Sequence, residues 1–182
     1  ASSLSFAATP TQSGHWLIAD LNKMSQSEFE KAIAPVFEKA PWAVKATGER
    51  RPYRSFMDMY RAMDVIINSA DAQVQLDLIN SHPDLACKGV RPANVGEHSQ
   101  KEQAGSGLNE CSPEEAVLLK DLALAYHNKF GFTFFLAAAG FNRVEIAEQL
   151  KMRMNNTRDK EFATAMQQIS KVMLMRMIAT AK

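Results

Sequence analysis

Helix-start signals recur along most of this chain and constrain its fold more than any other feature. Each consists of a Ser, Thr or Asn with acidic residues in the following turn, as in the capping box Ser25–Glu28. The starts are Ser25, Ser55, Ser99, Ser112, Asn142 and Thr157. No segment alternates apolar and polar residues as a half-buried strand would. The sequence therefore predicts an all-α protein, a compact single-domain multi-helix array.

Apolar residues at helical spacing follow these starts. The helix after Ser25 is expected to break at Pro35, and a third helix is expected from about Asp71 to Asn80. A short helix should open at Ser99 and end at Gly105. The helix after Ser112 should reach about Phe130 and bury Leu118, Leu122, Ala125 and Tyr126. The apolar run 132–139 is compatible with a strand or a buried helical turn, because its periodicity does not decide between them.

Length and composition fit one globular domain. The chain has 182 residues, of which 46% are hydrophobic, enough to bury a core without disulfides or metal. We expect a flexible N-terminal segment over 1–18 and a single helical domain over 19–182. The 21 basic and 20 acidic residues are interspersed, which argues against a nucleic-acid partner. No run approaches the roughly 20 apolar residues that span a bilayer, so no membrane partner is expected.

The two cysteines provide neither a disulfide framework nor a zinc spacing. Cys87 and Cys111 are separated by 23 intervening residues, and we expect them to be buried thiols in the core. Thiols fit a reducing compartment. The predicted localisation is therefore cytoplasmic.

Arg176 is an unusual residue for its position. The last predicted helix places Met166, Ile169, Val172 and Met173 on one apolar face, and Arg176 falls near the centre of that face. A buried guanidinium keeps its proton and therefore needs an anionic or strongly polar partner. The partner is either an internal acid, such as Glu145, Glu148 or Glu161, or a bound ligand.

His82 is the histidine best placed for chemistry. It precedes Pro83 at the end of the third predicted helix, so rigid backbone holds it at a helix terminus. The negative end of the helix dipole should favour its protonated form. The alternative interpretation is a polar residue that only terminates the helix. His127, by contrast, projects away from the predicted apolar stripe and should be solvated.

Other signals for catalysis are sparse. Glu102 completes the predicted capping box with Ser99, which accounts for its position, although the same geometry could present its carboxylate to a pocket. The chain has no glycine-rich phosphate loop and no nucleophile elbow, and its His and acid spacings match no metal-binding helix. We expect no metal site.

Several segments together resemble the 2-oxo-4-hydroxy-4-carboxy-5-ureidoimidazoline (OHCU) decarboxylase family of purine degradation. No single motif is specific, but their order and spacing are, and they span about residues 21–177. The matching segments are Leu21–Ser25, Pro41–Trp42, Arg51–Tyr53 with Ser55, Ser81–Ala86, Ser99–Gln103, Ala104–Leu108, Tyr126 with Lys129–Phe132, Arg153–Asn156 and Ile169–Met177. The chain departs from the family at Thr133, where proline is usual, and at Cys87, where glycine is frequent.

This resemblance implies a fold, an activity and a set of site residues. The family is all-helical, homodimeric and free of metal or organic cofactor, and it converts OHCU, the small-molecule substrate, to (S)-allantoin. The implied catalytic residues are His82, Glu102 and Arg176. Pro83 and Ser99 would also line the site, and the segment around Phe132 and Phe134 would contact the substrate.

Three other classes of helical protein compete with this interpretation. His82-Pro83-Asp84 is also the signature of J-domain co-chaperones, but residues 73–80 before it contain no lysine or arginine, whereas the corresponding J-domain helix is basic. A histidine phosphotransfer domain needs an exposed histidine within a bundle helix, and His82-Pro83 breaks that pattern. A plain helical interaction module remains open if Arg176 pairs only with an internal acid.

Overall fold

The computed structural model describes residues 17–88 and 97–180, apart from the side chains of residues 97–99 and 102. All regular elements in these residues are helices, as predicted. Their bounds are α1 Ile18–Lys23, α2 Gln26–Ile33, α3 Pro41–Glu49, α4 Phe56–Asn68, α5 Ala72–Asn80, α6 Glu97–Gly105, α7 Pro113–Phe130, α8 Arg143–Arg153 and α9 Arg158–Thr180. The predicted flexible segment 1–18 lies almost wholly outside the described residues.

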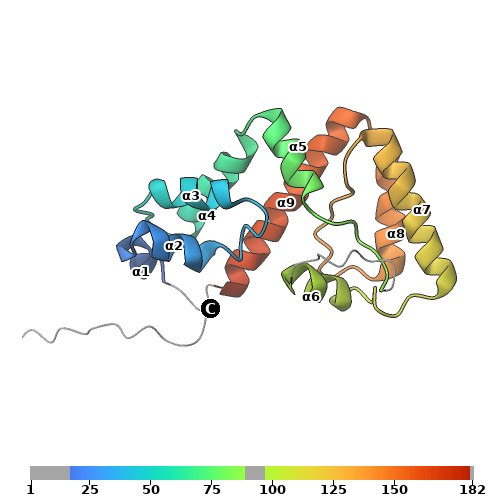
Figure 1. The fold of residues 1–182 in the computed structure, drawn as a ribbon, viewed down its shortest axis with the longest axis horizontal. Coiled ribbons are helices and arrows are strands. Elements are labelled where there is room, and N and C mark those ends of the chain that lie inside the picture. The colour runs from blue at the N-terminus through green and yellow to red at the C-terminus, as the bar shows by residue number, and fades with distance from the viewer. Residues whose placement is uncertain (1–16, 89–96, 181–182) are drawn as a thin grey trace, which may run out of the picture.

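The long helix α9 joins the two halves of the molecule. Helices α1 to α4 lie on one side of it and α7 and α8 lie on the other, with α5 beside its middle (Figure 1). Its buried face includes Ala165, Ile169 and Val172, which belong to the central hydrophobic cluster. Core residues from both halves therefore meet along α9. Side chains from segments far apart in the sequence can lie close together at this junction.

Most predicted helix starts are confirmed. Ser25 and Ser112 form capping boxes with Glu28 and Glu115, and Asn142 does the same with Glu145. Helix α2 ends at Ile33, two residues before Pro35, as expected. Helix α7 ends at Phe130 and is capped by Gly131, whose φ of 79° suits a residue without a side chain.

Two details of these helices were predicted wrongly. Helix α6 begins at Glu97, so Ser99 lies inside the helix and not at its cap. In α7 the buried positions are Leu119, Ala123, Tyr126 and Phe130, so Tyr126 is buried as predicted, while Leu118 is 42% exposed. The predicted stripe was displaced because apolar residues fill adjacent positions of this helix, so periodicity alone did not fix its orientation.

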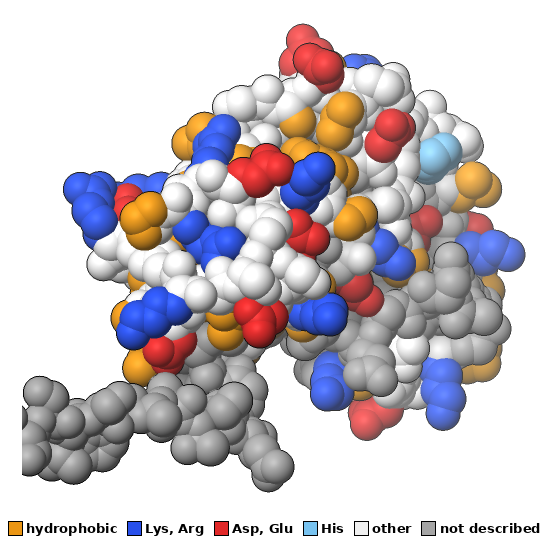
Figure 2. Space-filling view, turned by 60° about the vertical axis from the view of Figure 1, so that its left-hand side comes forward, with side chains coloured by type: hydrophobic (Ala, Val, Ile, Leu, Met, Phe, Trp, Pro, Cys, Tyr) orange, Lys and Arg blue, Asp and Glu red, His pale blue; other side chains and the backbone are white. Residues whose placement is uncertain are grey.

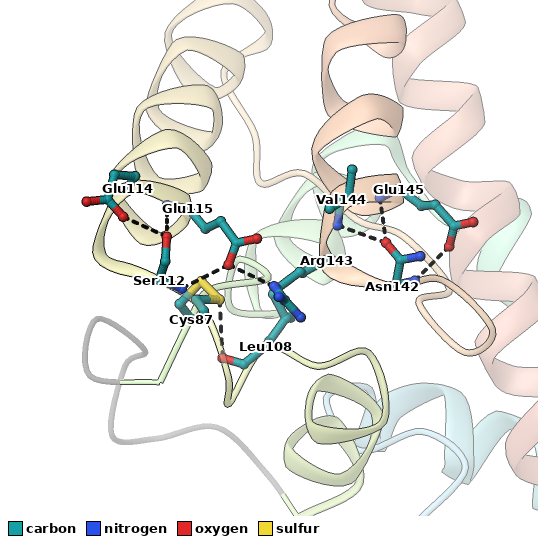
Figure 3. A network of polar contacts seen from close by, with 10 residues as sticks. Cys87, Leu108, Ser112, Glu114, Glu115, Asn142, Arg143, Val144 and Glu145 are labelled. Carbon is teal, nitrogen blue, oxygen red and sulfur yellow. Dashed lines mark hydrogen bonds and ion pairs between the residues drawn. A yellow bond between two sulfur atoms is a disulfide. The ribbon is translucent and has the colours of Figure 1, made fainter.

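The starts of α7 and α8 are linked to each other. Glu115 accepts hydrogen bonds from the Ser112 backbone N–H (2.8 Å) and from Nε of Arg143 (2.7 Å), as Figure 3 shows. One carboxylate thus completes the cap of α7 and forms an ion pair with the first residue of α8. This arrangement fixes the N-terminal ends of the two helices against each other.

The cysteines are not the thiols that we expected. Cys87 and Cys111 form a disulfide, shown beside the α7 cap in Figure 3. The bond ties the segment after His82 to the loop after α6, and Lys88 N–H donates to the Leu108 carbonyl beside it (2.9 Å). Because disulfides persist mainly in oxidising compartments, this finding removes the support that free thiols gave to a cytoplasmic location.

Residues 132–139 form neither a strand nor a helical turn. They run as an extended, largely buried segment from the end of α7 toward α8. Side chains of other elements form hydrogen bonds with three of its backbone groups. Asn80 Oδ1 accepts from Thr133 N–H (3.0 Å), Arg153 Nη1 donates to the Phe135 carbonyl (2.7 Å), and Gln168 Oε1 accepts from Ala137 N–H (3.1 Å). These contacts hold irregular backbone inside the protein.

A buried polar network lies beneath this segment. Glu161 is fully buried and accepts hydrogen bonds from Arg153 Nε (2.6 Å), Tyr126 Oη (2.5 Å) and Asn156 Nδ2 (2.7 Å). The Arg153 guanidinium also stacks over the Phe134 ring, 4.5 Å from its centroid. The network joins α7, α8 and α9 and positions the extended segment above them.

The charged residues on the viewed surface are mixed. Lys and Arg alternate with Asp and Glu across the face seen in Figure 2. Within the described residues, no helix is long and apolar enough to cross a membrane.

We expect the Arg153→Met variant to lose about 3–5 kcal/mol of unfolding free energy, because Glu161 would then be a buried charge without its cationic partner. Urea denaturation followed by circular dichroism measures this change. Arg54→Ala is the control, since Arg54 pairs with Asp58 at a side chain that is 87% exposed. Equal stability of Arg153→Met and wild type would contradict the importance of the network.

Candidate active site

Two small adjoining cavities lie where α5, α9 and the extended segment meet. Four predicted site residues line the first cavity, namely His82, Pro83, Phe134 and Arg176. Its other lining residues are Leu85, Gln103, Phe135, Leu136 and Ala138. The second shares His82, Phe135 and Arg176 and adds the turn after α2, including Glu38 and Lys39. Imidazole and guanidinium therefore border one continuous site.

His82 is held in a defined tautomer. Its Nδ1 lies 2.8 Å from the Leu78 carbonyl oxygen, one turn earlier in α5. A carbonyl can only accept, so Nδ1 carries the proton and Nε2 is left with the lone pair. The ring also meets Phe135 edge to face, with centroids 4.6 Å apart. This packing fixes the orientation of a side chain that is only 8% exposed.

Burial keeps the His82 imidazole neutral. Its pKa is lowered from 6.5 to about 4, mainly by desolvation and also by the nearby charges of Arg176 and Lys39, although the hydrogen bond to Leu78 acts in the opposite direction. The sequence had suggested that the end of α5 would favour the protonated form. That prediction was wrong because the loss of hydration outweighs the favourable carbonyl contact.

Arg176 is buried on α9, with 7% of its surface exposed. Among the described side chains, an acid beside it is Glu38, whose Oε2 lies 3.7 Å from Nη1. The sequence had offered Glu145, Glu148 and Glu161 as internal partners, but Glu161 pairs with Arg153. Because Glu38 lines the second cavity together with His82 and Arg176, the ion pair does not remove the guanidinium from the site.

The other predicted site residues are distributed unevenly. Pro83 and Phe134 line the first cavity with His82. Phe132 does not, since it is fully buried against the rings of Tyr126, Phe130 and Phe162. The backbones of Ser99 and Glu102 belong to α6, but their side chains lie outside the described part of the structure.

Two polar residues of the site were not predicted. Gln103 is 1% exposed and lines the first cavity, and its Oε1 has no hydrogen-bond partner among the described residues. Its position beside Glu102 in the Ser99–Gln103 motif was the available signal. Glu38 carried no signal, because it follows the Pro35 break and its contacts come from a helix far along the sequence.

Asp84 is half-buried directly after Pro83 and lines neither of these two cavities. Burial raises the pKa of its carboxyl, while the hydrogen bond from the Phe134 backbone and the charge of His127 lower it. His127 itself is exposed on α7, as predicted.

The arrangement is suited to moving protons beside a fixed cation. A neutral imidazole can accept a proton, and a planar guanidinium can bind carboxylate or carbonyl oxygens through paired donors. Among the described residues, no group of His, Cys, Asp and Glu has the geometry of a metal site. Fold and site therefore define an all-helical protein in which a neutral imidazole and a buried guanidinium border the same cavities.

The chain belongs to the OHCU decarboxylase family. The family profile matches residues 22–178. A 2-oxo-4-hydroxy-4-carboxy-5-ureidoimidazoline decarboxylase of Halalkalicoccus jeotgali is 32% identical over 160 residues, which cover 88% of this chain and 89% of that protein. A uric acid degradation bifunctional protein of Bacillus sp. (strain TB-90) is 36% identical over 160 residues, which cover 88% of this chain. The match spans only 31% of that longer protein.

Two solved structures share the fold. The crystal structure of an OHCU decarboxylase in the presence of (S)-allantoin has a TM-score of 0.67 and 21% identity, covering 84% of this chain and 97% of the other. The crystal structure of an (S)-allantoin synthase has a TM-score of 0.73 and 20% identity, covering 91% of this chain and 53% of the other.

We predict that His82 titrates near pH 4 in the folded protein. Between that value and 6.5 the unfolded chain binds more protons than the native one, so His82 adds stability as pH rises through this window and removes it as pH falls. Imidazole NMR shifts recorded from pH 8 downward measure the midpoint. A His82 midpoint at or above 6.5 would contradict the burial argument.

Proposed function

We propose that this chain decarboxylates OHCU to (S)-allantoin without a metal or organic cofactor. The observation that carries the proposal is the shared cavity of His82 and Arg176 in a chain that belongs to the OHCU decarboxylase family. The proposed catalytic residues are His82, Glu102 and Arg176. Pro83, Ser99 and Phe134 are proposed to line the substrate site, and Phe132 supports it from the core.

The chemistry of OHCU explains what the protein must supply. One ring carbon carries both a carboxylate and a hydroxyl, and its neighbour is an imine carbon that bears the ureido group. When the bond to the carboxylate breaks, CO₂ leaves and the electron pair moves toward the imine, whose nitrogen gains a proton. The substrate contains its own electron sink, so no cofactor is needed to hold the charge.

A second proton movement completes the product. The intermediate is an enol, which loses its hydroxyl proton and gains a proton on the ureido-bearing carbon to give allantoin. We propose that Nε2 of the neutral His82 takes the hydroxyl proton, because Nδ1 already donates to Leu78. Protonation from one face then yields the S form.

Arg176 and Glu102 have supporting parts in this proposal. The Arg176 guanidinium would bind anionic or carbonyl oxygens of the substrate and hold the ring against His82. Because it is fixed before the reaction, it can stabilise charge without reorganising. Glu102 would orient the imidazole and tune its charge.

We expect freshly generated OHCU to form optically active allantoin faster with this protein than without it. The His82→Ala variant should lose about 10²- to 10⁴-fold in rate, the usual contribution of general acid–base catalysis, while remaining folded. Circular dichroism of the product measures the rate. His127→Ala is the matched control because it removes an exposed histidine.

Arg176→Lys in the same assay separates charge from geometry. A lysine keeps the positive charge but lacks the planar pair of donors, so turnover should fall well below wild type. Wild-type rates for both His82→Ala and Arg176→Lys would exclude the proposed mechanism. A J-domain-like function would instead appear as stimulation of a chaperone ATPase by the wild-type protein.

We also propose a homodimer, on the basis of family membership. Light scattering coupled to size-exclusion chromatography should give twice the chain mass, and a monomeric mass at working concentrations would contradict the proposal.

A cytoplasmic location remains a prediction from the sequence. The Cys87–Cys111 disulfide weighs against it, and cell fractionation tests it.

A further inference from the structure

Glu38 has an acceptor atom that the protein itself leaves unused. The Oε2 atom of Glu38 is buried and has no hydrogen-bond partner among the described residues. Its distance of 3.7 Å from Arg176 Nη1 is an ion-pair contact but too long for a hydrogen bond. A buried carboxylate oxygen without a donor is costly, so this atom is poised to accept a hydrogen bond from something that enters the cavity.

The surrounding structure holds this carboxylate in place. Glu38 lies in the turn between α2 and α3, where Val36 and Phe37 are buried on one side and Ala40 on the other. Backbone hydrogen bonds from Val36, Phe37 and Ala40 to residues three positions earlier keep the turn compact. The side chain is 19% exposed and borders the cavity that it shares with His82 and Arg176. It is therefore a fixed part of the site and not a mobile surface acid.

We propose that Glu38 is a further substrate-binding residue, which accepts a hydrogen bond from an N–H of the ureido group. This inference rests on the proposed OHCU decarboxylation. The substrate carboxylate has no donor and would be repelled by Glu38, whereas the ureido group carries amide N–H donors and no charge. Glu38 and Arg176 would thus bind opposite kinds of group, a donor and an acceptor, and set which way round the substrate lies beside His82.

The Glu38→Gln variant tests this role without changing the size of the side chain. The glutamine oxygen can still accept, but without the negative charge that strengthens the bond, so kcat/KM for OHCU should fall by about 10-fold. The fall should come mainly from KM, because the ureido group takes no part in bond breaking. Glu49→Gln is the matched control, since Glu49 on α3 is 59% exposed and makes only a long contact with Lys45.

Two ligands distinguish contact with the ureido group from a merely structural role. Allantoin carries the ureido group, and hydantoin is the same ring without it. NMR titration of Glu38→Gln and of its control Glu49→Gln measures the affinity for each ligand. Compared with the control, Glu38→Gln should bind allantoin more weakly and hydantoin equally well. Equal weakening of both ligands would overturn the proposal, because it would mean that Glu38 only positions Arg176. So would a Glu38→Gln variant with wild-type kcat/KM and wild-type allantoin affinity.

The failure of this proposal is separable from that of the proposed function. If the wild-type protein does not accelerate allantoin formation, decarboxylation is excluded, and the assignment of Glu38 falls with it. If the wild type is active and Glu38→Gln matches Glu49→Gln, only the role of Glu38 is excluded.

Discussion

The buried contact between Arg153 and Glu161 is the interaction on which the site depends. Irregular backbone is difficult to bury because its polar groups need partners that helices supply automatically. Arg153 solves this for residues 132–139 by donating to the Phe135 carbonyl while its charge is balanced by Glu161. The extended segment can therefore pass through the interior and present Phe134, Phe135 and Leu136 to the cavity.

Two arginines are buried among the described residues, Arg153 and Arg176, and they serve different purposes. Arg153 donates hydrogen bonds to the Glu161 carboxylate and the Phe135 carbonyl, and its guanidinium lies over the Phe134 ring. Arg176 faces its carboxylate, Glu38, at 3.7 Å and borders the cavities. Its positive charge and the burial of His82 act together, since both disfavour the imidazolium. The site thus combines a permanent cation with a base that stays neutral.

Local signals predicted the helices well and their packing less well. Caps at Ser25, Ser112 and Asn142 were recognisable because every bond of a capping box lies within four residues. Helices α1 and α3 were not predicted, although Pro41 at the first turn of α3 is a recognisable start. His82 and Arg176 stood out by chemistry and position. Glu38 and the disulfide did not, because they depend on which distant segments meet, and a single sequence does not encode that in its spacing.

The Cys87–Cys111 bond closes a covalent loop that includes α6, the helix that carries Glu102 and Gln103. One end of the loop lies five residues after His82, so the same link limits how far α6 can move from the imidazole. An excess of a thiol reductant would break the disulfide and remove this limit on the movement of α6. Purified samples prepared with and without reductant are therefore two chemically different proteins, and the redox history of a preparation belongs with every rate measured on it.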